Sequence, residues 1–220
     1  MFPLILAAVV ATAAPADGTY TYVTSLNGAQ IEKTAVTVTH DPSGNIVLSE
    51  SASGNMNGRS GSLTDTLTLD AALAPVGYKS NASIADSRSM QAALAFKGDS
   101  ATQSGDVTKT YTLGDTAKHF VIFDFGPFTG YFALPAQMQA WNDDPVIAIV
   151  PMYAQAVAIS IDKTFTPDRP KDVPATDVQL TVKNPVQLTV WYDPKTLIVD
   201  RMDVPAEDLN VIRVSSPGSP

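Results

Sequence analysis

Residues 19–39 decide the fold class, and they read TYTYVTSLNGAQIEKTAVTVT. Apolar and polar side chains alternate through residues 19–26, so Tyr20 and Tyr22 fall on one face of an extended strand. The dipeptide Asn27-Gly28 follows, which is typical of two-residue hairpin turns. Residues 30–39 alternate again, with Val36 and Val38 on one face. The stretch therefore predicts an antiparallel β-hairpin.

Stretches of the same kind follow along the chain. Alternation and turn residues predict further strands at residues 46–51, 63–70, 78–84, 88–96, 107–113, 177–183, 186–192, 196–204 and 209–214. Residues 88–96 are rich in alanine and would also suit a helix, but their alternation favours a strand. We expect turns at residues 98–100 and 103–105, and a mobile loop at residues 53–62, which hold three glycines. Residues 146–161 are nearly uncharged and predict one bent strand or two, divided at Pro151.

One segment predicts a helix. Leu134, Met138 and Trp141 have the spacing i, i+4, i+7, which places them on one apolar helix face. Pro135 is compatible with the first turn of such a helix. Together with the strands, this segment predicts a mainly β protein: a curved antiparallel sheet or an unclosed β-barrel, with one or two short helices over the concave face. The chain has 19 Asp and only 3 Glu, which agrees with a fold rich in turns.

The two ends of the chain differ from the middle. Residues 1–16 are uncharged apart from the terminal amine, and their apolar run ends in the small-residue triplet Ala14-Pro15-Ala16. This pattern predicts a signal peptide, although a buried N-terminal strand or helix is the alternative. We expect a single β-rich domain at residues 17–214, a disordered tail at residues 215–220, and export to a periplasm or the extracellular space. No later stretch of the sequence is long and apolar enough to span a membrane.

The composition excludes several classes of function. The net charge of −8 offers no general attraction to nucleic acid or to anionic lipid. The absence of cysteine excludes disulfides, thiolate metal sites and cysteine nucleophiles. We expect no metal site and no cofactor, because the sequence contains no phosphate-binding glycine motif and only two histidines, His40 and His119. A hydrolase with a Ser-His-Asp triad would have to use one of these two histidines.

The arrangement resembles the LolA/LolB-like superfamily of periplasmic unclosed β-barrels and uncharacterised secreted domains near it. The resembling parts are the predicted signal peptide, the hairpins from Thr19, the Pro- and aromatic-rich segment from Phe125 to Trp141, and the ending LTVWYDPKTLIVDRM at residues 188–202. The resemblance is one of pattern and covers most of the predicted mature chain. It implies a cavity for a lipid or another hydrophobic molecule, by analogy of fold alone.

The aromatic segment at residues 119–132 reads HFVIFDFGPFTGYF and holds five of the eight phenylalanines. We interpret this segment and the helix after it as the wall of a ligand pocket, and packing in the core is the alternative. Asp124 is expected to point outward, because it alternates with Phe123 and Phe125. The predicted lining consists of Phe120, Phe123, Phe125, Phe128, Tyr131, Phe132, Met138 and Trp141.

These observations lead to three hypotheses for function. The first is a secreted or periplasmic, non-enzymatic binding protein for a hydrophobic, lipid-like molecule, which predicts a cavity beside the aromatic segment. The second is a structural or protein-interaction module of the cell envelope, which predicts a contiguous exposed apolar patch. The third is a hydrolase, which predicts His40 or His119 within hydrogen-bond reach of both a serine and an aspartate.

Overall fold

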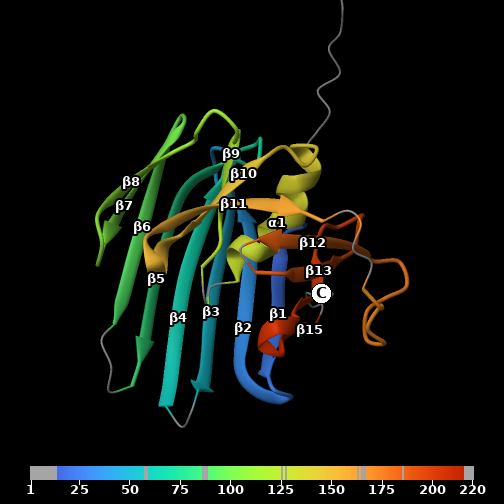
Figure 1. Cartoon of the computed structure of the whole chain (residues 1–220). Coiled ribbons are helices and arrows are strands. Elements are labelled where there is room, and N and C mark those ends of the chain that lie inside the picture. The colour runs from blue at the N-terminus through green and yellow to red at the C-terminus, as the bar shows by residue number, and fades with distance from the viewer. Residues whose placement is uncertain are drawn as a thin grey trace, which may run out of the picture.

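The computed structural model describes residues 14–56, 59–85, 89–124, 126, 128–162, 164, 167–184 and 186–215. Within them one sheet curves around a single helix, α1 (Thr129–Ala140), as Figure 1 shows. The first eight strands are β1 (Gly18–Leu26), β2 (Ala29–His40), β3 (Ile46–Met56), β4 (Arg59–Leu69), β5 (Pro75–Ile84), β6 (Met90–Lys97), β7 (Ser100–Gly105) and β8 (Lys109–Thr112). The other seven are β9 (His119–Ile122), β10 (Val146–Val150), β11 (Gln155–Ile161), β12 (Val178–Asn184), β13 (Leu188–Tyr192), β14 (Val199–Val204) and β15 (Leu209–Ser215).

The sheet has the order β8-β7-β6-β5-β4-β3-β2-β1-β15-β14-β13-β12-β11-β10-β9. The predicted mainly β architecture and the unclosed, mostly antiparallel sheet are confirmed. The hairpin at residues 19–39 is β1 and β2, and Tyr20, Tyr22, Val36 and Val38 all lie in the core. The strand predicted at residues 88–96 is confirmed over residues 90–96, which belong to β6, and residue 88 lies outside the described residues. The segment at residues 146–161 forms two strands, β10 and β11, separated by the short 3₁₀ helix η1 (Pro151–Tyr153).

Two expected loops are strands instead. In the predicted loop at residues 53–62, residues 53–56 and 59–62 continue the ladder between β3 and β4, which pairs Ser53 with Ser62 and Gly54 with Gly61, and residues 57 and 58 lie outside the described residues. The predicted turn at residues 103–105 is the end of β7, where Gln103 pairs with Leu94. Glycine and serine are poor strand formers by themselves, but pairing on both sides outweighs that local preference. One pair of strands, β9 and β10, is parallel, which the sequence analysis did not anticipate.

The two edges of the sheet meet through side chains. Gln103 on β7 donates a hydrogen bond from Nε2 to the Pro151 carbonyl at 2.9 Å, and Lys109 on β8 donates from Nζ to the Ala154 carbonyl at 2.7 Å. The rings of Phe96 on β6 and Phe120 on β9 lie 5.8 Å apart. The sheet therefore approaches a barrel without a continuous ladder of backbone hydrogen bonds.

The helix α1 begins six residues before Pro135, so the prediction that Pro135 lies in the first turn is wrong. Pro135 occupies the interior of the helix, and most of α1 is buried, including Gly130, Phe132 and Leu134. Because the curved sheet encloses most of this helix, it needs no continuous polar face. No helix in the described part of the chain is long and apolar enough to cross a membrane.

Candidate binding cavity

A cavity of about 430 Å³ lies on the concave side of the sheet, beside the first turn of α1. Its walls come from both halves of the sheet and from the segment between β9 and α1. The volume falls within the roughly 300–1,000 Å³ typical of small-molecule sites. The apolar part of the lining includes Leu26, Ile31, Leu63, Leu188, Met202, Val204 and Leu209.

Three of the eight predicted lining residues contact this cavity. Phe123, Phe128 and Tyr131 line it. The Phe123 and Tyr131 rings lie 4.8 Å apart, and Phe128 packs on Tyr22 with the same centroid distance, 4.8 Å. Phe125 lies outside the described residues. The aromatic wall therefore begins at the end of β9 and continues into the first turn of α1.

The other four predicted lining residues, Phe120, Phe132, Met138 and Trp141, do not line the cavity. All four are buried within the hydrophobic core, at most 8% exposed. For these four side chains the alternative is correct: they pack in the core, because α1 lies deeper inside the curved sheet than a lid would.

Asp124 does not point outward as expected. It is 3% exposed, lines the cavity, and accepts hydrogen bonds from the Tyr78 hydroxyl at 3.1 Å and from the Met152 backbone N–H at 3.2 Å. The expectation rested on strand alternation, but β9 ends at Ile122 and so alternation no longer applies at Asp124. Burial and the nearby charges of Asp124 and Glu207 raise the pKa of Tyr131, so its hydroxyl remains protonated.

A second carboxyl group faces the cavity from β2. Glu32 accepts hydrogen bonds at Oε1 from Thr34 Oγ1 at 3.0 Å and from Thr24 Oγ1 at 3.4 Å. Burial raises the pKa of Glu32, and the two threonine hydrogen bonds oppose that rise. The alternation that buries Val36 and Val38 also turns Glu32 and Thr34 toward the concave side.

Below the first turn of α1, two carboxyl groups lie side by side on neighbouring strands. Glu50 on β3 is paired in register with Asp65 on β4, and both are buried. Glu50 Oε2 accepts hydrogen bonds from the backbone N–H groups of Phe128 at 2.5 Å and Thr129 at 3.2 Å, and Asp65 Oδ2 accepts one from the Thr129 hydroxyl. Glu50 thus satisfies two backbone amides at the start of the helix, where intrahelical partners are absent, and Asp65 satisfies the hydroxyl of Thr129.

The surroundings of the two carboxyl groups favour a proton held between them. Burial, together with the charge of Asp65, raises the pKa of Glu50 well above its ordinary value, and burial also raises the pKa of Asp65. Glu50 Oε1 and Asp65 Oδ1 are buried and accept no hydrogen bond from another described group. A proton held between the two carboxyl groups would provide a hydrogen bond at this site, and it would leave one negative charge beneath the positive end of the helix dipole.

The far end of α1 is anchored to the connection between β4 and β5. Gln137 donates a hydrogen bond from Nε2 to the Leu73 carbonyl at 3.0 Å, and Trp141 donates from Nε1 to the Ala72 carbonyl at 2.9 Å. At the start of the helix, Gly130 lies so close to β9 that a Cβ atom would meet the Ile122 carbonyl oxygen at 2.0 Å. Both ends of α1 are therefore held in place, and the first turn is fixed as a wall of the cavity.

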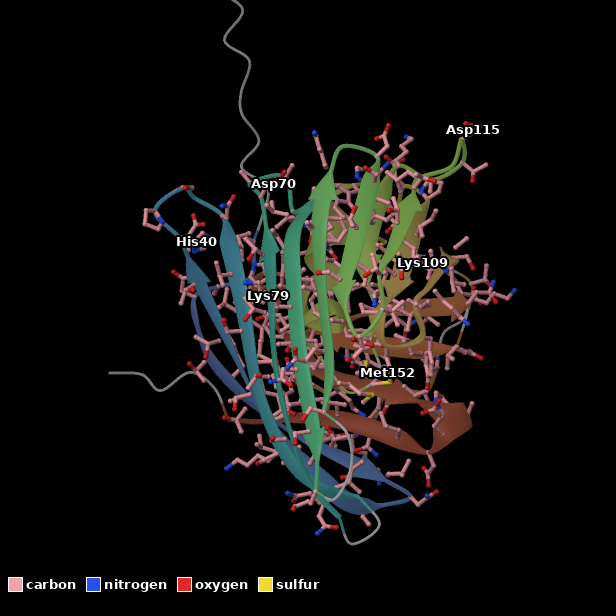
Figure 2. The ribbon with its side chains drawn as sticks, turned by 90° about the vertical axis from the view of Figure 1, so that its left-hand side faces the viewer. His40, Asp70, Lys79, Lys109, Asp115 and Met152 are labelled. Carbon is pink, nitrogen blue, oxygen red and sulfur yellow. The ribbon has the colours of Figure 1, made fainter. Side chains whose placement is uncertain are left out.

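Neither histidine lines the cavity. His40 is at the rim of the sheet, well away from Met152 of the cavity lining (Figure 2), and its Nδ1 lies 2.7 Å from Asp17 Oδ1. His119 stacks on Trp141 at 4.1 Å, and its Nε2 lies 3.8 Å from Asp144 Oδ2. Burial lowers the pKa of His119. Among the described contacts no serine hydroxyl reaches either ring, so the geometry required for the histidine-dependent hydrolase is not present there.

Comparison with known proteins places the chain by its fold. No family model and no curated protein matches it. The fold is similar to that of a β-barrel-like protein with the domain of unknown function DUF1849 from Brucella abortus, with 9% identity, a TM-score of 0.54, and coverage of 93% of this chain and 96% of that one. A DUF1089 family protein from Pseudomonas aeruginosa is also similar, with 10% identity, a TM-score of 0.49, and coverage of 80% and 90%. The chain therefore has a β-barrel-like fold that it shares with an uncharacterised protein.

The sequence contains a signal for the buried acidic residues Glu50 and Asp65, which the predicted lining does not include. Glu50 follows Ile46 and Leu48 at the alternating positions of a core-facing strand, and Asp65 lies between Leu63 and Leu67 in the same way. Charged side chains are rarely buried without a partner. A carboxyl group at a core-facing position therefore indicates a buried partner, although it does not identify that partner.

Proposed function

We propose that the protein is an exported, non-enzymatic binding protein for a hydrophobic, lipid-like small molecule that occupies the concave cavity. The observation that carries the proposal is the cavity itself: about 430 Å³, with mostly apolar walls and the aromatic side chains of Phe123, Phe128 and Tyr131 on one side. The predicted signal peptide and the resemblance to the LolA/LolB-like superfamily support export and carriage of a hydrophobic ligand, the second by fold analogy alone.

The interaction-module hypothesis receives less support. The exposed large hydrophobic side chains of the described residues are few, and they belong to different elements or connections of the fold. They are Val76, Val107, Tyr153, Val178 and Val214. Scattered single residues of this kind are normal on a soluble surface.

The test measures binding of a homologous series of uncharged linear alcohols, from hexanol to decanol, to the purified full chain by calorimetry. Each buried methylene contributes about 0.8 kcal/mol, so we expect roughly a fourfold fall in Kd per added carbon until the cavity is filled. The variant Ile31→Trp fills cavity space and should abolish binding. Ile147→Trp is the matched control, because Ile147 is also a half-buried isoleucine but does not line the cavity. Absence of binding to the unaltered chain would refute the proposal.

A further inference from the structure

The titratable side chains that line the cavity are mostly acidic, and this restricts the headgroup that a ligand can have. The titratable side chains among the described lining residues are Glu32, Asp124, Tyr131 and Glu207, and no lysine, arginine or histidine is among them. Three of the four are acids, and burial holds Tyr131 protonated. A carboxylate or phosphate headgroup would therefore meet charges of its own sign and no described cationic partner.

Glu32 is the acid best placed to receive a ligand group. Its Oε1 atom already accepts both threonine hydrogen bonds, from Thr24 and Thr34, and these fix the orientation of the carboxyl group. No described group donates a hydrogen bond to Oε2, and this atom is not among the buried polar atoms without a partner. Among the described residues, Oε2 of Glu32 is therefore an acceptor atom that remains available to a ligand.

The aromatic side chains of the lining suit a positive charge as well. Phe123, Phe128 and Tyr131 present aromatic rings to the same cavity. Aromatic ring faces attract ammonium groups, and they do so more strongly where water is excluded. The Glu32 carboxylate and the aromatic wall thus favour the same kind of headgroup by independent physical effects.

We propose that the ligand is a cationic amphiphile, with an alkyl or aryl body in the apolar part of the cavity and a protonated amine that donates a hydrogen bond to Glu32 Oε2. This inference rests on the proposed function, because it specifies the headgroup of the molecule that the cavity would hold. A charge-assisted hydrogen bond of this kind is shorter and stronger than one between neutral groups.

The test compares three ten-carbon probes with the full chain at pH 7.5 by calorimetry, each below its micellar concentration: decylamine, decanol and decanoate. We expect decylamine to bind at least tenfold more tightly than decanol, and decanoate to bind most weakly. In the variant Glu32→Gln the preference for decylamine over decanol should fall to less than threefold while decanol binding persists. Asp115→Asn is the matched control, because Asp115 is an exposed acid outside the cavity lining, and it should retain the preference.

The outcomes separate the two proposals. If none of the three probes binds, the proposed function fails and the headgroup inference fails with it. If decanol binds but decanoate binds as tightly as decylamine, the cavity binds hydrophobic molecules and only the headgroup inference is overturned. The inference is also overturned if Glu32→Gln leaves the preference for decylamine unchanged, or if it weakens all three probes equally.

Discussion

Replacing Glu50 with glutamine tests whether a proton is held between Glu50 and Asp65 beneath α1. The amide of Gln has the same shape as a protonated carboxyl group, so its oxygen can accept the hydrogen bonds from Phe128 and Thr129 while its nitrogen donates to Asp65. The variant therefore keeps every hydrogen bond of the protonated pair, but it cannot ionise. The free energy of unfolding of the variant should therefore differ from that of the unaltered protein only at pH values at which Glu50 releases a proton on unfolding.

The sign of the effect follows from the raised pKa. Burial, the charge of Asp65 and the nearby charge of Glu32 all favour the protonated form of Glu50 in the folded state, whereas the unfolded chain releases that proton near the ordinary value of 4.5. The folded state thus binds more protons than the unfolded state above that pH. The stability contributed by the protonated pair is complete below about pH 4.5 and is lost as the pH rises toward the pKa of the folded state.

The magnitude has an upper bound from linkage. One proton changes the free energy of unfolding by at most about 1.4 kcal/mol per pH unit. Relative to the unaltered protein, Glu50→Gln should therefore gain stability between pH 5 and pH 8, by up to about 4 kcal/mol. Asp65→Asn should behave differently at low pH, because it puts an NH2 group in place of one of the two Asp65 oxygens that face Thr129 and the protonated Glu50. While Glu50 is protonated, the donor left buried and unsatisfied costs about 1–3 kcal/mol.

The assay is urea unfolding followed by circular dichroism at half-unit steps from pH 5 to pH 8. Other titrating groups cancel when the curve of the unaltered protein is subtracted from that of Glu50→Gln. Two results would refute the reasoning: parallel stability curves for the two proteins, or a Glu50→Gln variant that is the less stable of the two at pH 8. Either would show that Glu50 is ionised in the folded state at neutral pH.

Two further substitutions test the packing and the second acidic pair. Gly130→Ala should lower the free energy of unfolding by roughly 2–3 kcal/mol, because its Cβ would meet the Ile122 carbonyl oxygen. The control Gly114→Ala, whose Cβ would have nothing within 4 Å, should change the free energy of unfolding by less than about 0.5 kcal/mol. Equal effects of the two variants in urea unfolding would contradict the close approach of α1 to β9. Burial, together with the nearby charge of Asp200, raises the pKa of Asp177 to about 7. Asp177→Asn should therefore gain stability relative to the unaltered protein as the pH rises from about 4 to 7, and gain no more above pH 7. A difference in Tm that is independent of pH would exclude this.

Much of the fold could be predicted from local pattern. Alternation at residues 19–39, with its Asn27-Gly28 turn, is a property of adjacent residues, and it correctly predicted a hairpin and its buried face. The strands at residues 46–51 and 63–70 were recognised in the same way, but their extensions through Gly54 and Gly61 were not. Those glycines have no strand preference of their own, and they are extended because neighbouring strands pair with them.

The candidate site could also be predicted from the sequence only in part. The sequence identified the aromatic segment as the place to look, and Phe123, Phe128 and Tyr131 do line the cavity. The depth at which α1 lies inside the sheet determines which aromatic side chains face the cavity and which fill the core. The close approach of Gly130 to the Ile122 carbonyl on β9 sets that depth. Hydropathy cannot make this distinction, because a core and an apolar pocket use the same residues.

By itself the sequence determined the β-rich class, the positions of most hairpins, the location of the helix and the segment that holds most of the aromatic side chains. Each of these follows from interactions between residues close together in the chain. Only the tertiary structure decided that Glu50 meets Asp65 beneath α1, that Asp124 turns inward, and that Glu32 faces an apolar cavity with an acceptor atom available. Burial and electrostatics depend on which distant strands enclose a side chain, and that enclosure exists only once the sheet has curved around its helix.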